Sequence, residues 1–508
     1  MVWTAEIGWR DERQMPELAD ITLALDALPR LPADVLRPQY AREDLTAGIV
    51  HIGLGNFHRA HQAWYTHRLM QQGLALDWAI VGAGVRPADA TQRDRLAKQD
   101  YLTSLIELAP DRSLVEVTGA MIDFVPVETG NGALIARMSQ PDIRIVALTV
   151  TEGGYFIDPV TKAFDADHPD IQHDLAHPDT PKTAFGAMIA ALRQRRASGV
   201  GPFTCMCCDN LQNNGAVLRQ TLVSLAEMID ADLADWIAGN CSFPNAMVDC
   251  IVPATGEAEL AMIRGFGIAD AAPVTHEDFR QWVIEDDFCA GRPAWDQVGA
   301  IFTDDVHPFE AIKIRILNGG HQILANAGEI LSVETIAGCM AHPLISGAFE
   351  KIARDEIKPH LPSVPGIEVD AYIDLIKRRF ANRRIFDTTR RVAFDGSARH
   401  PGFLLPSVRD GLQTGAPVRG LALAEAMWAR MCTGVREDGS PIAPNDPAWE
   451  ALTVVAAQAQ DDPSAWLKQE FYGTDLASAS DFATAFADWM TIIKRDGVEA
   501  ALATYVNG

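Results

Sequence analysis

The sequence has few basic side chains for its length. Its 508 residues include 43 Lys and Arg against 68 Asp and Glu, which gives a formal net charge of -25 at pH 7. Such a charge repels nucleic acids and anionic membrane surfaces at long range. We therefore expect neither of them as a partner.

Long apolar runs are also missing. Nowhere do 18 uncharged apolar residues follow one another, which is the length that a transmembrane helix requires. Residues 1–20 mix acidic and basic side chains and lack the apolar segment of a signal peptide. The sequence therefore predicts a cytoplasmic protein with no membrane contact.

Cysteine is scarce and scattered. The eight cysteines show no spacing typical of a disulfide framework, and only Cys205, Cys207 and Cys208 are clustered. This cluster could hold zinc, but no matching Cys or His pair is near it in the sequence. An apolar run that ends in cysteines is more typical of a buried strand, so we expect no metal.

The chain does contain a normal share of apolar residues, 48%, with 22% charged residues, and it is too long for one ordinary core. Short apolar runs alternate with amphipathic segments up to about residue 300, and helical spacing dominates after that. The pattern predicts an α/β protein with an N-terminal arm, a Rossmann-like doubly wound domain and a mostly α-helical C-terminal domain. The predicted limits are 1–47, 48–300 and 301–508.

A Gly-x-Gly turn follows the first predicted strand of the alternating region. Gly53 permits a tight turn, Gly55 lets the backbone approach a pyrophosphate, and Asn56 and Phe57 lead into the next helix. His58 stands where the usual fingerprint has a third glycine, so a plain strand-turn-helix also explains the spacing. The place of the turn at the first strand favours a dinucleotide site.

The second predicted strand ends in Gly-Ala-Gly-Val-Arg-Pro-Ala-Asp, where a Rossmann-like domain binds the adenosine ribose. Asp89 favours NAD because an acid binds the ribose hydroxyls, and Arg86 favours NADP because an arginine accepts a 2′-phosphate. A surface turn explains both residues equally well. The sequence therefore predicts NAD, with NADP as the weaker alternative.

The segment from Lys313 to His321 contains a lysine, a carboxamide and an imidazole with helical spacing. An α-helix would place Lys313, Asn318 and His321 within an arc of about 140°. A lysine with an ordinary pKa of about 10.4 is a poor base, but burial or a cationic neighbour lowers such a pKa. The alternative is a solvated helix on which Glu310 pairs with Lys313 and Asn318-Gly-Gly forms the C-cap.

Seven ordered blocks over about 350 residues resemble one family, the polyol-specific long-chain dehydrogenases, which include mannitol 2-dehydrogenases, arabinitol dehydrogenases and uronate reductases. The blocks are HIGLGNFHRAHQAWY at 51–65, TVTEGGY at 149–155, CDNLQNNG at 208–215, FPNAMVD at 243–249, QWVIED at 281–286, KIRILNGGH at 313–321 and DGSARHP at 395–401. The resemblance implies a metal-independent oxidoreductase that acts on CH–OH groups.

The resemblance also implies roles for single residues. Lys313 corresponds to the general base, Asn210 and Asn318 to the carboxamides around the reacting oxygen, and Glu310 to the proton path. His321 belongs to the same catalytic set. The implied substrate-binding residues are Asp249, Glu152, Arg391 and Arg399, and Thr151 is an implied cofactor contact. Asn210 also follows a predicted parallel strand, at the end where open α/β sheets bind ligands.

Three departures from the family pattern concern the substrate. Cys250 stands where arginine is common, Arg399 where lysine is common, and Arg383-Arg384 replace a small turn. An arginine-rich segment could receive a carboxylate, although a solvated helix face paired with acids is the commoner explanation. Its arginines are Arg378, Arg379, Arg383, Arg384, Arg390 and Arg391.

We therefore expect NAD-dependent oxidation of a linear polyol, mannitol- or arabinitol-like, to the ketose and the reverse reduction, in a cleft between the domains. A fructuronate or tagaturonate reductase is the alternative within the family. A non-catalytic dinucleotide-binding sensor and a zinc-dependent polyol dehydrogenase are the alternatives outside it. The protein is expected to be a monomer or a small homo-oligomer.

Overall fold

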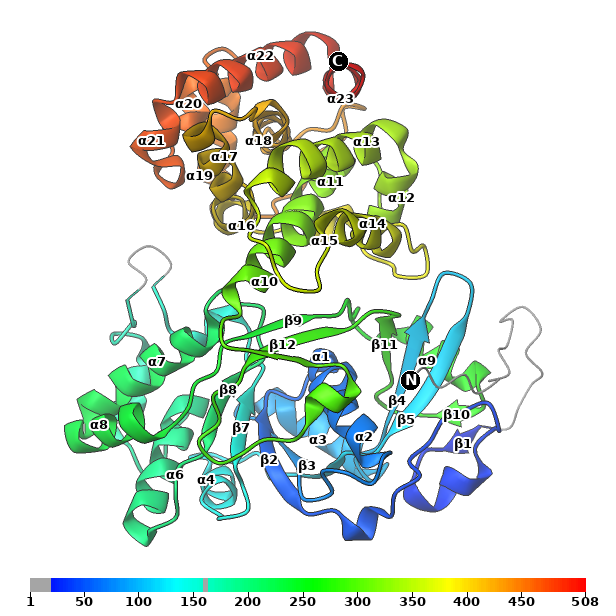
Figure 1. Ribbon diagram of the computed structural model, residues 1–508, viewed down its shortest axis with the longest axis vertical. Helices are drawn as coiled ribbons and strands as arrows, with labels where there is room; N and C mark the ends of the chain where they lie inside the picture. The colour runs from blue at the N-terminus through cyan, green and yellow to red at the C-terminus, as the bar shows by residue number, and fades with distance from the viewer. Residues whose placement is uncertain (1–19, 159–162) are drawn as a thin grey trace. The chain divides into compact units, whose positions relative to one another are not determined.

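The computed structural model describes residues 20–158 and 163–508, and the chain divides into two units between Val306 and His307. The division falls shortly after the limit at residue 300 that the sequence suggests. Figure 1 shows the two units, with sheets in the first and helices in the second. Each unit is described by itself below.

A five-stranded parallel sheet forms the centre of the first unit. Its strand order is β6-β3-β2-β7-β8, so the chain starts in the middle of the sheet and returns across it. The strands are β2 (Ala47–Ile52), β3 (Ala79–Ala83), β6 (Met121–Phe124), β7 (Ile145–Leu148) and β8 (Thr204–Cys207). The order reverses at β2, which places the turn after β2 where such sheets bind ligands.

Both faces of this sheet are buried, and alternate residues of each strand serve opposite faces. In β7, Val146 and Leu148 belong to one apolar cluster, whereas Ile145 and Ala147 belong to another. The first face is covered by α4 (Gly132–Met138), α6 (Ala184–Ser198), α7 (Asn214–Ile229) and α8 (Ala231–Asn240). The second is covered by α2 (Gln62–Met70), α3 (Pro87–Ala97), β9 (Ala246–Asp249) and β12 (Gln281–Glu285). Burial on both faces explains why β7 is a continuous apolar run.

Three smaller sheets complete the first unit. Their orders are β11-β4-β5, β13-β12-β9 and β1-β10. The additional strands are β1 (Ile21–Thr22), β4 (Thr103–Leu108), β5 (Ser113–Thr118), β10 (Ile268–Ala269), β11 (Val274–Glu277) and β13 (Ile301–Thr303). The sequence around residues 21–28 suggests one short helix, but the structure has strand β1 followed by a 3₁₀ helix at Leu25–Arg30.

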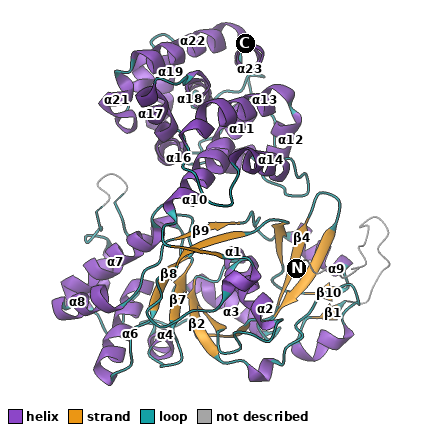
Figure 2. Cartoon of the chain, viewed as in Figure 1, coloured by secondary structure: helices purple, strands orange, loops and turns teal. Residues whose placement is uncertain are grey.

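The second unit is built from helices around one apolar core. In Figure 2 every strand arrow of the described chain lies in the first unit. Its central helices are α11 (Gly319–Ile330) and α18 (Arg419–Met431), which pack against each other. Other helices are α10 (His307–Ile312), α12 (Ile336–Ala341), α13 (Pro343–Ile352), α14 (Val369–Phe380), α15 (Thr389–Val392), α16 (Gly396–Phe403), α17 (Leu405–Thr414), α19 (Trp449–Ala459), α22 (Ser480–Asp496) and α23 (Val498–Asn507).

These observations confirm the predicted fold class, a Rossmann-like domain followed by a mostly helical one. Among the described helices, none combines the length and the apolar character that a bilayer crossing demands.

Candidate active site

The predicted site residues lie in both units. Those of the first unit lie around the ends of β2, β3, β7, β8 and β9, and those of the second unit lie in or beside α10, α11, α15 and α16. The first unit contains the expected cofactor residues. The second contains the expected proton acceptor.

The turn after β2 requires glycine at one position and leaves space at another. Gly53 has φ +88°, and a Cβ atom there would overlap the carbonyl oxygen of Thr149. The hydroxyl of Thr149 also donates to the carbonyl of Gly53. A Cβ at Gly55 would meet no described atom within 4 Å. The loop is thus fixed against β7 at Gly53 and open at Gly55, which is the arrangement that lets a phosphate approach the backbone.

His58 takes the place of the third glycine by stacking on another histidine. Its ring lies 3.5 Å from the ring of His51 in β2, centre to centre, and both side chains are fully buried. His51 bonds Gln62 and the hydroxyl of Thr149, each at 2.8 Å. Burial lowers the pKa of His51 to about 3 and that of His58 well below its ordinary value, so both rings are neutral. A flat neutral ring therefore packs where other loops use glycine.

The side chains of Asn56 and Phe57 make contacts within the protein. The Asn56 amide donates to Pro253 at 3.2 Å and to Thr255 at 2.9 Å, and its oxygen accepts from Arg59 at 2.7 Å. Phe57 stacks on His61 with 4.8 Å between ring centres. These contacts hold the loop, so a cofactor role for either residue falls to its backbone.

Asp89 lies in the first turn of α3, and its Oδ2 accepts the backbone N–H of Arg86 at 2.9 Å. The same carboxyl group packs over Gly84, just after β3. This hydrogen bond stabilises the start of the helix. The assignment of Asp89 to a ribose stays a prediction.

The ends of β7 and β8 are joined by a residue that sequence reasoning missed, Asp209. Its carboxylate accepts the backbone N–H groups of Val150 at 2.9 Å and of Thr151 at 3.1 Å. Asn210, the next residue, is exposed, and so is Thr151. Asp249 ends β9 and is buried, whereas the side chain of Glu152 lies outside the described residues. An aspartate after a strand is too common for its clamping role to be visible in one sequence.

In the second unit, Lys313–Asn318 is a π-helical turn between α10 and α11. Its i→i+5 hydrogen bonding brings Lys313 and Asn318, five residues apart, closer to the same side than an α-helix would. Lys313 is 5% exposed and Glu310 is 4% exposed. These burials exclude the solvated Lys–Glu helix face, and the π turn corrects the predicted α-helical arc.

Asn318 and His321 occupy different environments on the same helical segment. Asn318 is 8% exposed, and its buried Oδ1 has no hydrogen-bond partner among the described residues. His321 stacks on Phe380 of α14, with 4.2 Å between ring centres. A buried amide oxygen without a partner is costly, which makes Asn318 a candidate for ligand contact.

The two glycines after Asn318 do not cap a helix. Gly319 has φ −63° and ψ −43°, so the helix continues through it into α11. A Cβ at Gly320 would overlap the ring of Phe349 of α13. The glycines therefore allow close helix packing, and the C-cap alternative is wrong.

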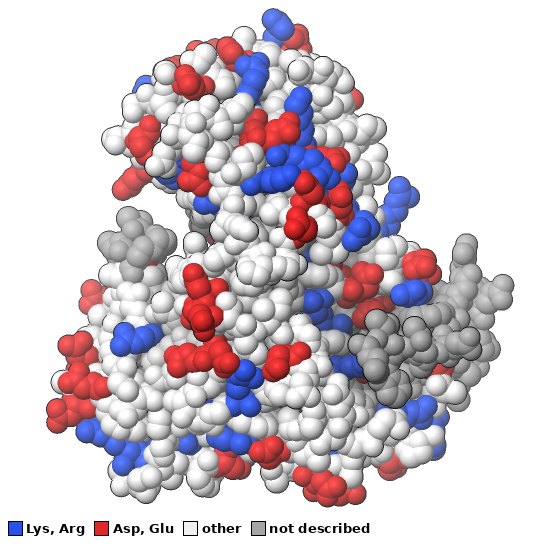
Figure 3. Space-filling model, viewed as in Figure 1, with Lys and Arg blue, Asp and Glu red and all other residues white. Residues whose placement is uncertain are grey.

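The predicted sugar contacts Arg391 and Arg399 have partners within the second unit. Arg391 is bonded to both carboxylate oxygens of Asp387, at 2.7 and 2.6 Å, and its side chain is 67% exposed. Arg399 donates to the carbonyl of Val392 at 2.8 Å. Figure 3 shows basic and acidic side chains side by side on this unit. The pairing of Arg391 favours the solvated-face explanation over a carboxylate receptor for that arginine.

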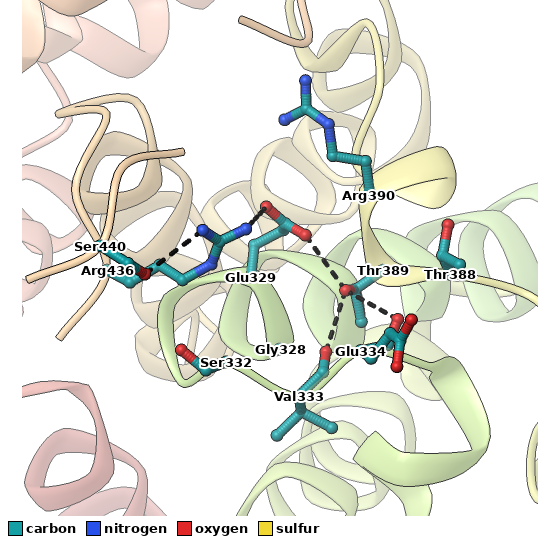
Figure 4. Close-up of a pocket in the computed structure, with 10 residues that line it drawn as sticks. All are labelled: Gly328, Glu329, Ser332, Val333, Glu334, Thr388, Thr389, Arg390, Arg436 and Ser440. Atoms are coloured by element: carbon teal, nitrogen blue, oxygen red, sulfur yellow. Dashed lines mark hydrogen bonds and ion pairs between the residues drawn. The ribbon is translucent and has the colours of Figure 1, made fainter. Parts of the chain in front are cut away.

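A separate pocket of 460 Å³ lies in the second unit between the end of α11, α15 and the loop around Arg436 (Figure 4). Its buried Glu329 accepts from Thr389 at 3.2 Å and from Arg436 at 3.2 Å. None of the ten residues that line it belongs to the predicted site. Its buried carboxylate, Glu329, is paired with Arg436, so we keep the catalytic hypothesis for the π turn.

The cysteine cluster lies in and after β8. Cys205, Cys207 and Cys208 are buried and form no disulfide among the described residues, and the Cys207 sulfur lies 2.8 Å from the hydroxyl of Tyr155. This placement fits the predicted buried strand.

Comparison with known proteins identifies the family. The mannitol dehydrogenase Rossmann domain matches residues 47–297, and the mannitol dehydrogenase C-terminal domain matches residues 305–493. The chain belongs to the mannitol dehydrogenase family. It is therefore an oxidoreductase that acts on CH–OH groups, as the resemblance implied.

Full-length relatives support this membership. The chain is 52% identical to a mannitol 2-dehydrogenase of Cereibacter sphaeroides over 93% of this chain and 99% of the relative, and 39% identical to one of Pyricularia oryzae over 96% and 98%. Among solved structures, a Pseudomonas fluorescens mannitol 2-dehydrogenase in ternary complex with NAD and D-mannitol matches with a TM-score of 0.85 and 41% identity, covering 96% of this chain and 100% of the other. A substrate-free D-sorbitol dehydrogenase matches with a TM-score of 0.87 and 34% identity, covering 94% and 100%.

Proposed function

We propose that the protein catalyses the NAD-dependent oxidation of a linear polyol, mannitol- or arabinitol-like, to the corresponding ketose and the reverse reduction. The observation that carries this proposal is the buried π-helical turn that contains both Lys313 and Asn318, in a chain so similar to mannitol 2-dehydrogenases. No metal is part of the proposed mechanism.

The turn after β2 fits a dinucleotide. Gly53 holds the loop against β7, and the space above Gly55 admits a pyrophosphate. We assign cofactor contacts to the backbone at Gly53, Gly55, Asn56 and Phe57, and further contacts to Asp89 and Thr151. When bound, NAD supplies the acceptor for the substrate hydride.

Lys313 takes the proton of the substrate hydroxyl in this proposal. Its burial removes it from bulk water, as a general base requires if it is to work at neutral pH. Glu310, three residues earlier and also buried, passes the proton onward.

The carboxamides of Asn318 and Asn210 hold the reacting oxygen. Each carboxamide offers N–H donors to an oxygen on which negative charge develops. The Oδ1 of Asn318, which lacks a partner among the described residues, is available to a substrate hydroxyl. His321, whose ring is held by Phe380, orients a further hydroxyl.

The remaining assignments concern the sugar chain. We keep Asp249, Glu152 and Arg399 as substrate-binding residues. Arg391 is the weakest of these assignments because Asp387 already occupies two of its donors. The cytoplasmic location and the monomeric or small homo-oligomeric state stay predictions.

The test is a substrate panel followed by NADH absorbance at fixed pH. We expect oxidation of mannitol or arabinitol with NAD and reduction of fructose with NADH, at rates unaffected by a chelator. Faster reduction of fructuronate or tagaturonate than of fructose would replace the polyol assignment with a uronate reductase. Tight NADH binding without turnover of any substrate would identify a sensor, and loss of activity on chelation would identify a metal enzyme.

A further inference from the structure

One carboxylate, that of Asp209, joins two loops that carry predicted site residues. Its Oδ2 accepts the N–H of Val150 at 2.9 Å, and its Oδ1 accepts the N–H of Thr151 at 3.1 Å. Its Oδ2 also accepts the hydroxyl of Tyr155 at 2.6 Å. The loop after β7 is thus fixed to the loop after β8 by hydrogen bonds to a charged acceptor, which are stronger than neutral ones.

The loop after β7 needs such an anchor. Thr151 has φ +70° and ψ 160°, a conformation that is unfavourable for a β-branched residue. Strain of this kind costs on the order of 1–3 kcal/mol and persists only where surrounding contacts enforce it. The Asp209 carboxylate accepts the N–H groups of Thr151 itself and of the residue before it, so it is one of the contacts that hold this conformation.

Tyr155 extends the anchor into the core. Its side chain is buried, and burial raises the pKa of its hydroxyl well above the ordinary value, so the phenol stays protonated and donates a hydrogen bond to Asp209. The carbonyl of Tyr155 accepts from Thr221 of α7 at 2.7 Å. The carboxylate is therefore held from three sides.

The backbone of Asp209 is held as well. Its carbonyl accepts the side-chain amide of Asn214, at the start of α7, at 3.1 Å. Asn210 is the next residue along the chain. The hydrogen bonds to the side chain and to the carbonyl of Asp209 thus restrict the backbone position of Asn210.

We propose that Asp209 is a positioning residue, which sets the places of Thr151 and Asn210 without touching substrate or cofactor itself. This inference rests on the proposed function, because it assigns Asp209 to the same reaction. Misplacement of a reacting group by about 1 Å can lower a rate by a hundredfold.

The test is Asp209→Asn, which keeps the shape of the side chain but places an amide donor opposite a backbone N–H or a hydroxyl donor. The matched control is Asp174→Asn. Asp174 is fully buried in the first unit, whereas Asp209 is half-buried, and like Asp209 it accepts two backbone N–H groups and one hydroxyl. The N–H groups are those of Lys182 at 2.6 Å and Thr183 at 3.0 Å, and the hydroxyl is that of Thr183 at 2.6 Å. No predicted site residue lies in the loop that it holds.

We expect both variants to lower the melting temperature, but only Asp209→Asn to lower kcat, by about tenfold to a hundredfold at saturating polyol and NAD. Tyr155→Phe removes one of the three hydrogen bonds and should give a smaller loss of kcat in a well-folded protein. It also serves as the test if Asp209→Asn does not fold.

The outcomes separate the two proposals. Wild-type kcat in a folded Asp209→Asn variant, or in Tyr155→Phe when the first does not fold, overturns the positioning role and leaves the proposed function intact. An equal loss of kcat in Asp174→Asn also overturns it, because the effect would then follow general stability. A wild-type protein that oxidises no polyol overturns the proposed function and this inference together.

Discussion

At the scale of single residues, two kinds of position carry the proposed chemistry. Lys313 and Asn318 are polar groups kept away from water, and Gly53 and Gly55 are positions where the lack of a side chain matters. Substitutions at these positions distinguish chemical roles from structural ones.

Lys313→Ala should lower kcat by about a hundredfold or more, because the hydroxyl proton loses its acceptor. The dissociation constant of NADH, measured by fluorescence titration, should change little, because the proposed cofactor contacts lie in the first unit. Lys358→Ala is the control, since that lysine is partly exposed and paired with Asp370 at 2.5 Å. Ordinary turnover in Lys313→Ala would remove the lysine from the mechanism.

Gly53→Ala and Gly55→Ala should fail in different ways. At Gly53 the added methyl group overlaps Thr149 in a strained φ region, so the free energy of unfolding should fall by about 1–3 kcal/mol. At Gly55 there is space for the methyl group, so stability should hold while the NADH dissociation constant rises at least about tenfold. Wild-type NADH affinity in Gly55→Ala would show that the pyrophosphate binds elsewhere.

At the scale of elements, the strands were predictable and the π turn was not. Strands such as β7 are short apolar runs because both their faces are buried, and this pattern is visible in the sequence. A six-residue π turn such as Lys313–Asn318 has no periodicity of its own, so the sequence predicts ordinary α-helical spacing there. Asn318-Gly-Gly looked like a helix end because the ring that requires Gly320, Phe349, is distant in the sequence.

The packing of α11 against α13 gives a prediction at this scale. Gly320→Ala should lower the free energy of unfolding by about 1–3 kcal/mol, because the methyl group overlaps Phe349. Gly402→Ala in α16 is the control, since an added Cβ atom there would meet no described atom of a neighbouring element within 4 Å. Alanine at this position should stabilise the helix by up to about 1 kcal/mol. Chemical denaturation measures both. Recovery of stability in Gly320→Ala with Phe349→Leu would confirm the cause, and equal stability of the two alanine variants would contradict it.

At the scale of the whole molecule, the division into an α/β unit and a helical unit followed from the change in spacing near residue 300. The contacts that join distant segments did not follow from it. The hydrogen bonds of Asp209 to Val150 and Thr151 span 59 and 58 residues, and no local pattern marks either end.

Stability should fall in mild acid because the first unit buries neutral histidines. Burial lowers the pKa of His51 to about 3 and that of His61 to about 4, and it also lowers the pKa values of His58 and His276 well below the ordinary value. Below about pH 6.5 these histidines bind protons in the unfolded chain but not in the folded chain. The stabilisation that they give is therefore fully present above that pH and is lost progressively as the pH falls below it. Each histidine contributes up to about 1.4 kcal/mol per pH unit.

Urea unfolding between pH 7.5 and 5.5 measures this loss. His58→Phe retains an aromatic ring over His51 and cannot titrate, so its stability should fall less steeply as the pH is lowered. The number of protons that the variant takes up on unfolding in mild acid should be smaller by about one. Identical slopes for the variant and the wild-type protein would show that His58 does not contribute.

The stack of His51 and His58 also has a consequence for how the sequence of this loop evolves. Replacing either ring alone leaves the other facing a void or an intruding side chain, so the two codons should change together among related chains. Related proteins with glycine at the position of His58 are expected to carry a residue other than histidine at the position of His51. A search pattern written for three glycines would pass over every descendant that inherited the paired rings.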